Sequence, residues 1–280
     1  MKNKGTVVAL ILILISGIGL YAAWMNRDLP EQPLPMPSTS GVVAVGGGAA
    51  TKTAVSVTAP RRTQTPKTSV PSKGSYGYNY PGVTPAVAVL NAKEWALLLV
   101  NRAFALPADF SIETAVCVTV YPENIQLDAR VAPEFRKMYN AAQKDGVELI
   151  PFSGYRRIST QKKNFDDKIA EYVGEGMSLA EAVSKAAESI LPPGCSEHEA
   201  GLAIDLTRKG VWATRMDFAT TKEFAWLQAH AAEYGFILRY PEGKEGITKV
   251  KYEPWHWRYV GKEAALAMKT SGQCLEEYAG

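Results

Sequence analysis

Two short segments of this 280-residue chain contain the residue types that a hydrolytic metal site needs. The first contains His198 and several carboxylates up to Asp205, and the second contains Glu253 and His256. Two imidazoles and one carboxylate leave one position of a tetrahedral zinc site open for water. Imidazole and carboxylate are ligands that suit zinc, and the lack of a cysteine cluster argues against a closed structural site. Because the chain has only three histidines, this placement predicts a catalytic site for one zinc ion.

Glu253 stands three residues before His256 and is the best candidate for a general base. Zinc lowers the pKa of a bound water to about 7. A free carboxylate beside that water can accept its proton and later deliver the proton to a leaving amine. Pro254 restricts Glu253 to an extended conformation. We therefore expect Glu253 and His256 on a strand end or a turn, rather than on the H-E-x-x-H helix of other metalloproteases.

Three segments resemble the signatures of a known family. Their sequences are Ser196-x-His198-x-x-Gly201-x-Ala203-x-Asp205, Glu253-x-Trp255-His256-x-Arg258, and Ser153-Gly154-Tyr155-Arg156 followed by Gln161. They resemble those of the VanY-type zinc D-alanyl-D-alanine carboxypeptidases. Smaller similarities occur at residues 234–241 and 243–245, and the resemblance extends from about residue 89 to about residue 270.

This resemblance implies a fold, a cofactor and a catalytic group. The fold is the one shared by zinc D,D-peptidases and the Hedgehog signalling domain. The cofactor is one zinc ion, and the family pattern assigns His198, Asp205 and His256 as its ligands. The same pattern assigns Glu253 as the general base.

The resemblance also implies how a peptide is held. Arg156 matches the residue that binds the terminal carboxylate of the substrate. Its guanidinium suits this role because it binds a carboxylate through two parallel hydrogen bonds. Ser153, Gln161 and Ser196 match positions near the bound peptide. Three residues differ from the usual ones of the family without removing a ligand or the base: Arg157, Ala200 and Lys249. Arg157 adds a charge next to the carboxylate-binding position and leaves the precise substrate open.

Two further residues allow another interpretation. Cys195 and His198 form a C-x-x-H spacing that would make Cys195 a metal ligand, but no second cysteine pair supports this alternative. His230 lies in an amphipathic helix pattern, and we interpret it as a structural residue.

The first 25 residues predict a membrane anchor. Lys2 and Lys4 precede an uncharged apolar run over residues 6–25, which is long enough to cross a bilayer. A cleaved signal peptide is the alternative, but the run is long and lacks a good cleavage site. The lysines place the N-terminus in the cytoplasm and the rest of the chain outside. Residues 26–84 are rich in Pro, Gly, Ser and Thr and predict a disordered linker.

Residues 85–280 suffice for one catalytic domain with a substantial core. Helices are expected at 92–104, 132–145, 159–172, 178–189, 221–234 and 262–269. Strands are expected at 115–121, 148–153, 202–207, 236–239 and 250–259. These elements predict an α+β domain with a small, mostly antiparallel sheet and flanking helices. Three pairs look like a helix N-cap and its partner: Asn91 with Glu94, Ser178 with Glu181, and Thr220 with Glu223.

The composition limits the partners. A net charge of +3 is far from that of a nucleic-acid-binding domain. Three cysteines in an exported domain permit one disulfide and a leftover thiol. The family resemblance implies a zinc carboxypeptidase that removes the C-terminal D-Ala from peptidoglycan stem peptides. An L,D-carboxypeptidase, a peptidoglycan endopeptidase and a non-catalytic wall-binding module are the alternatives. The oligomeric state stays open.

Overall fold

The structure, a computed structural model, describes residues 79–120 and 123–279. The expected membrane anchor at 1–25 and nearly all of the expected linker at 26–84 lie outside the described residues. Among the helices that the structure describes, none has both the length and the apolar character that a membrane span requires.

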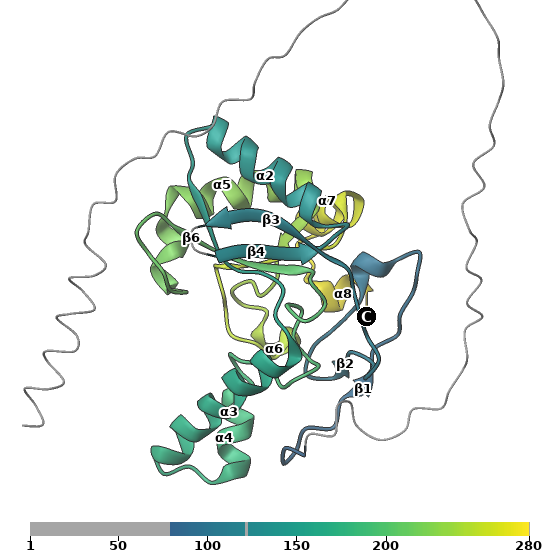
Figure 1. The fold of residues 1–280 in the computed structure, drawn as a ribbon, viewed down its shortest axis with the longest axis vertical. Coiled ribbons are helices and arrows are strands. Elements are labelled where there is room, and N and C mark those ends of the chain that lie inside the picture. Colours follow the sequence, from purple (N-terminus) through teal and green to yellow (C-terminus); the bar gives the residue numbers. More distant parts are fainter. Residues whose placement is uncertain (1–78, 121–122, 280) are drawn as a thin grey trace, which may run out of the picture. The chain divides into compact units, whose positions relative to one another are not determined.

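A four-stranded antiparallel sheet positions most of the candidate site (Figure 1). Its strand order is β5-β6-β8-β7, and every neighbouring pair is antiparallel. The strands are β5 (Leu149–Ser153), β6 (Ala203–Arg208), β7 (Phe236–Leu238) and β8 (His256–Tyr259). Two smaller pairs accompany this sheet: the antiparallel β3 (Thr114–Val120) and β4 (Glu123–Asp128), and the parallel β1 (Ala86–Val87) and β2 (Phe104–Ala105).

The main core forms between this sheet and two helices, α2 (Ala132–Lys144) and α5 (Lys222–His230). Phe135 and Met138 of α2 and Leu227 of α5 are fully buried. They share one apolar cluster with strand residues that include Leu149, Ile204, Leu206 and Trp257. A second cluster packs α7 (Lys262–Ser271) against β7 and the 3-10 helix η4 (Ala231–Tyr234). The predicted α+β class with a small antiparallel sheet is therefore confirmed.

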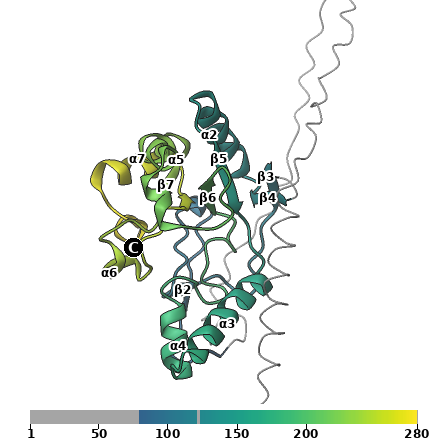
Figure 2. The ribbon, with the colours of Figure 1, turned by 90° about the vertical axis from the view of Figure 1, so that its left-hand side faces the viewer.

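Helices α3 (Ile158–Gly174) and α4 (Leu179–Ala186) lie together at one end of the structure (Figure 2). They have an apolar cluster of their own, in which Phe165 and Ile169 of α3 meet Ala182 and Val183 of α4. The predicted cap of α4 is confirmed, because Ser178 and Glu181 form a complete capping box. Helix α3 of this hairpin forms one wall of the cavity described below.

The predicted helix at 92–104 is wrong. Only Trp95–Leu97 forms a short 3-10 turn, and Phe104–Ala105 is a strand. Leu98 and Val100 face the main core, whereas Leu97 and Leu99 pack on the α7 cluster, so burial alternates as it does in extended chain. The carbonyls of Ala96 and Leu98 both accept hydrogen bonds from Arg258 Nη2 at 2.8 Å. In a helix these carbonyls would accept hydrogen bonds from backbone N–H groups of the same helix.

The predicted strand at 250–259 is wrong in its first half, because β8 begins only at His256. Residues 251–255 form a loop that contains Pro254, which lacks the N–H that a central strand donates. The sequence reasoning missed β4 and the short helices α6 (Glu245–Thr248) and α8 (Leu275–Ala279). The N-cap of α5 is Thr221 rather than Thr220, since its side chain accepts from Phe224 N. The other predicted elements are confirmed, with ends that differ by a few residues.

Candidate metal centre and its cavity

Three predicted site residues lie side by side on adjacent strands. Asp205 of β6 is the register partner of Ser153 on β5 and of His256 on β8. Cross-strand partners have Cβ atoms only about 5 Å apart. The sheet register therefore forms the row Ser153, Asp205, His256 without help from any loop.

His198 reaches this row from the turn that precedes β6. Gly201 makes the turn possible: its φ is +66°, and a Cβ there would lie 2.7 Å from Asp128 N. The His198 carbonyl accepts from Arg156 N at 3.0 Å. Its Nδ1 donates to the Gly154 carbonyl at 2.8 Å, and this assignment leaves Nε2 free for a metal.

His198, Asp205 and His256 form a group with the spacing of metal ligands. One ligand atom from each lies within 4.8 Å of the others, and all three residues are buried. Asp205 Oδ2 is 3.3 Å from His198 Nε2, and Asp205 Oδ1 is 3.2 Å from His256 Nδ1. Asp205 Oδ1 is buried and accepts no hydrogen bond. A buried carboxylate oxygen without a donor fits a metal ligand, and this donor set suits zinc.

The electrostatics of this group agree with a metal site. Burial raises the pKa of Asp205, but the two imidazoles outweigh burial and hold that pKa well below its usual range. Burial lowers the pKa of His256, but Asp205 and Glu197 outweigh burial and raise it to about 9. Burial lowers the pKa of His198. A proton and a metal ion compete for the same imidazole nitrogen, so two carboxylates beside His256 favour any cation there.

Glu197 contacts His256 on the side of the ring opposite Asp205 and fixes its orientation. Its Oε2 lies 3.3 Å from His256 Nε2, which leaves Nδ1 of His256 to face Asp205. Its Oε1 accepts from Arg239 Nε at 2.6 Å and from Arg258 Nη1 at 2.7 Å. Burial raises the pKa of Glu197, but the two guanidinium groups hold it well below the usual range.

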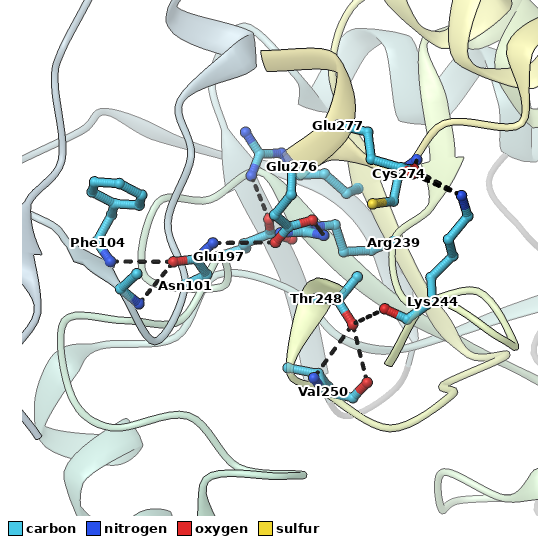
Figure 3. A network of polar contacts seen from close by, with 12 residues as sticks. Asn101, Phe104, Glu197, Arg239, Lys244, Thr248, Val250, Cys274, Glu276 and Glu277 are labelled. Carbon is cyan, nitrogen blue, oxygen red and sulfur yellow. Dashed lines mark hydrogen bonds and ion pairs between the residues drawn. The ribbon is translucent and has the colours of Figure 1, made fainter. Parts of the chain in front are cut away.

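Further polar contacts extend this network away from the cavity (Figure 3). Glu276 of α8 binds Arg239 through two hydrogen bonds of 2.8 and 2.7 Å. Asn101 donates to the same carboxylate at 3.1 Å. The side chains of Glu197, Arg239 and Arg258 are all 0% exposed. The orientation of His256 therefore depends on a buried ionic network that joins the turn before β6, the end of β7, strand β8 and helix α8.

Glu253 lies next to the metal group on the loop before β8, as expected. Its Oε2 is 3.7 Å from His256 Nδ1, and its backbone N–H donates to Tyr240 O at 3.1 Å. Burial raises the pKa of Glu253 to about 8, and the nearby Asp205 adds to this effect. A bound dication would oppose both effects and favour the carboxylate.

The structure brings Arg156, Ser153 and Gln161 together beside the same group. Arg156 Nη2 donates to Ser153 Oγ at 2.9 Å, and Nη1 donates to Gln161 Oε1 at 2.8 Å. Gln161 Nε2 donates to Leu191 O at 2.6 Å, which fixes its amide. Arg156 Nη2 lies 3.9 Å from Asp205 Oδ2. Ser153 and Gln161 therefore hold the guanidinium from the side away from the metal group. Its other side is partly exposed and faces the metal group.

A cavity of about 630 Å³ contains most of this arrangement. Its wall includes seven of the eight predicted site residues: Arg156, Gln161, Ser196, His198, Asp205, Glu253 and His256. Ser153 lines a neighbouring cavity of about 590 Å³ instead. Arg157 is exposed and belongs to that second cavity too, so its charge does not enter the main one.

The sequence reasoning missed three residues of the site: Glu197, Glu199 and Tyr240. Glu199 is buried and accepts from the backbone N–H groups of Gly194 and Ser196, so it fixes the turn before His198. Tyr240 lines the cavity with its ring 4.9 Å from that of His256. A signal for Glu197 was available, since Arg239 and Arg258 stand in apolar strand patterns and buried cations need a carboxylate partner.

The cysteines supply no ligand to this group. Cys195 lies in a small apolar cluster with Leu191, Tyr240 and Val250, and burial raises the pKa of its thiol to about 12. All three cysteines are free and buried, so the structure contains none of the disulfides that the sequence permits. His230 lies on α5 away from the site and pairs with Glu233, as its structural interpretation predicts.

Known proteins share this chain's fold and sequence pattern. The family model described as "VanY: D-alanyl-D-alanine carboxypeptidase" matches residues 124–262. A D-alanyl-D-alanine carboxypeptidase of Enterococcus faecalis is 39% identical over 186 residues, which are 66% of this chain and 66% of that protein. The chain thus covers just under two thirds of that relative's length.

The solved structures that are similar to this chain include two peptidases. One is a vancomycin-resistance D,D-pentapeptidase VanY variant in complex with Zn(II), with a TM-score of 0.58 and 39% identity over 67% of this chain and 100% of that one. The other is the LdcB LD-carboxypeptidase, with a TM-score of 0.59 and 37% identity over 66% of this chain and 86% of that one. The fold is the one that these two peptidase structures have. This chain belongs to the VanY family of D-alanyl-D-alanine carboxypeptidases.

Proposed function

We propose that this protein is a zinc-dependent carboxypeptidase that removes the C-terminal D-Ala from peptidoglycan stem peptides. One observation carries the proposal: a buried His198, Asp205 and His256 group shares its cavity with Glu253 and Arg156. The relatives named for D-Ala carboxypeptidase activity and for a complex with Zn(II) support both the reaction and the metal.

His198 Nε2, Asp205 and His256 Nδ1 would hold the zinc ion. When bound, zinc lowers the pKa of a coordinated water and polarises a carbonyl group. Glu253 lies within reach of a water bound beside these three ligands. It accepts the proton of that water and delivers it to the departing amine. Glu197 keeps His256 in the tautomer and orientation that present Nδ1. A non-catalytic wall-binding module would need no base at this position.

Arg156 gives the enzyme its preference for a free C-terminus. Ser153 and Gln161 accept its N–H groups and hold its guanidinium in one orientation, and a carboxylate can then pair with the remaining donors. A stem peptide that ends in D-Ala should therefore be cleaved much faster than the same peptide amidated at its C-terminus. Arg156→Ala should slow cleavage of the free acid and leave the slow cleavage of the amide nearly unchanged. Equal cleavage of both peptides by the wild-type chain would instead assign it to the endopeptidases.

The similarity to LdcB makes an L,D-carboxypeptidase the second candidate. Mass spectrometry of a stem pentapeptide and a stem tetrapeptide after incubation with the zinc-loaded full chain separates the two. A D,D-carboxypeptidase shortens the pentapeptide to a tetrapeptide and stops. An L,D-carboxypeptidase converts the tetrapeptide to a tripeptide. Failure to shorten either peptide would contradict both.

We also propose that this domain works outside the cytoplasmic membrane, behind an N-terminal anchor and a disordered linker. The apolar run at 6–25 and the composition of residues 26–84 support this arrangement. Limited proteolysis of the full chain should cut first within the linker. Protection of the domain from protease added to intact cells whose wall has been removed would contradict the location.

A further inference from the structure

The cavity continues beyond the metal group along one side of α3. Four polar residues of this helix line it together with His198 and His256: Asn164, Asp167, Lys168 and Glu171. Their spacing of three or four residues places them on one face of the helix. A neighbouring face buries Phe165 and Ile169 against α4. Helix α3 is therefore fixed through its apolar side and presents a polar row to the cavity.

The length of this row matches a short peptide. A helix rises about 1.5 Å per residue, so the row from Gln161 to Glu171 extends over about 15 Å. An extended peptide advances about 3.3 Å per residue, so about four residues fit along it. The row begins at the metal group, because Gln161 accepts from Arg156, which lies 3.9 Å from Asp205.

The proposed reaction fixes the direction of the peptide, and the present inference rests on that proposal. If Arg156 binds the terminal carboxylate, only one residue lies beyond the scissile bond. Every earlier residue of the substrate must then occupy the remaining cavity, one wall of which is the polar row of α3. Asp167 stands about 9 Å along the row from Gln161, at the level of the third or fourth residue from the end of the peptide.

This part of the wall carries a negative balance. Two carboxylates, Asp167 and Glu171, and one ammonium group, Lys168, line it. Asp167 pairs with Lys163 and Glu171 with Lys168, and the side chains of Asp167 and Glu171 are 62% and 53% exposed. Ion pairs whose acidic member is this exposed contribute little stability, so a substrate cation can replace them at small cost.

We propose that Asp167 and Glu171 select substrates with a cationic side chain two or three residues before the terminal residue. The fitting chemical class is a peptide with a diamino acid whose side-chain amine is free. A stem whose amine is already consumed by a crosslink lacks this charge. The site therefore favours uncrosslinked stems.

The test compares peptides that all end in D-Ala-D-Ala and differ only at the preceding residue. That residue is Lys in one peptide and Nε-acetyl-Lys in the other. The zinc-loaded wild-type full chain should cleave the Lys peptide with a kcat/KM about 3- to 10-fold higher. This preference should shrink as ionic strength rises, since salt screens exposed charges.

The variant Asp167→Asn/Glu171→Gln should lose the preference and keep its kcat/KM for the acetylated peptide. Glu175→Gln is the matched control, because Glu175 is exposed at the end of the same helix and does not line the cavity. It should retain the full preference. Equal cleavage of both peptides by the wild-type chain, or a preference that persists in the double variant, overturns the inference while the carboxypeptidase proposal stands. Cleavage of neither peptide overturns the carboxypeptidase proposal itself.

Discussion

The two ends of the cavity are built in opposite ways. At the metal end, the metal group, Glu253 and Glu197 are buried, and the sheet register and the Glu197 network fix the position of the metal group. At the α3 end, the two carboxylate side chains are more than half exposed and pair with lysines of their own helix. The first end has one arrangement that its packing determines. The second can exchange its ion pairs for others.

This difference separates two tasks of one enzyme. Chemistry needs ligands and a base held in a narrow range of geometry, which buried strands and satisfied hydrogen bonds provide. Selection among peptides needs only a modest difference in affinity, which exposed charges provide. Substitutions at the metal end should therefore have large effects on metal binding, on catalysis or on stability, and those at the α3 end should have small effects on metal binding and stability.

Removal of a ligand should have the largest effect. His256→Ala deletes the nitrogen that faces Asp205 and leaves two protein ligands, so stoichiometric zinc should be lost from the purified full chain. Peptide cleavage should fall to background. Metal analysis after dialysis measures the first effect. His230→Ala is the control, because His230 is half-exposed and lies away from the site. An unchanged zinc content in His256→Ala would contradict the ligand assignment.

Replacement of the base should separate chemistry from metal binding. Glu253→Gln keeps the size of the side chain but cannot accept a proton, so kcat should fall by the ~10²–10⁴-fold typical of general acid–base catalysis. Zinc should remain bound, because Glu253 is not among the three ligands. Glu242→Gln, an exposed change on a nearby loop, should leave kcat unaltered. A Glu253→Gln enzyme with more than a tenth of wild-type kcat would require another base.

Loss of the buried network should appear as lost stability. Glu197→Ala leaves Arg239 and Arg258 without their shared carboxylate in a fully buried position. Removing one member of a buried ionic group costs about 3–5 kcal/mol. Urea unfolding of the full chain with a chelator present measures this cost without the contribution of bound zinc. A loss below about 1 kcal/mol would mean that the two arginines find other partners.

The sequence contained most of the catalytic group but little of what holds it. His198, Asp205, Glu253 and His256 stand in short motifs whose residue types reveal their chemistry. Glu197 stands beside His198 and was missed, because its partners Arg239 and Arg258 are 42 and 61 positions away. A motif contains residues that are close together in one segment. A buried ion pair instead joins residues that are far apart in the sequence and meet only when the chain folds.

Contacts between distant segments also explain the main error in the predicted fold, which is the helix at 92–104. The segment at 92–104 has a helical pattern and a capping pair, and Asn91 does donate to Glu94 at 2.6 Å. Tertiary packing overrides this local preference, since the segment lies between two apolar clusters and two of its carbonyls accept hydrogen bonds from Arg258. The strands β5, β6 and β7 were predictable because each is a short run rich in apolar residues that lies next to a turn-favouring glycine, with Gly154 after β5, Gly201 before β6 and Gly235 before β7.

The smallest effect is expected for a substitution at the α3 end of the cavity. Asp167→Asn removes an exposed pair with Lys163, in which both side chains are more than half exposed. Exposed pairs one helical turn apart contribute about 0.3–0.5 kcal/mol, so the free energy of unfolding should change by less than about 0.5 kcal/mol. Zinc content should stay stoichiometric, because Asp167 lies about 9 Å along α3 from Gln161. The variant should therefore lower selection for the cationic peptide without a measurable change in stability. A loss as large as that of Glu197→Ala would mean that the α3 wall is as tightly built as the metal end, and that the division between a fixed catalytic end and an adaptable selecting end is wrong.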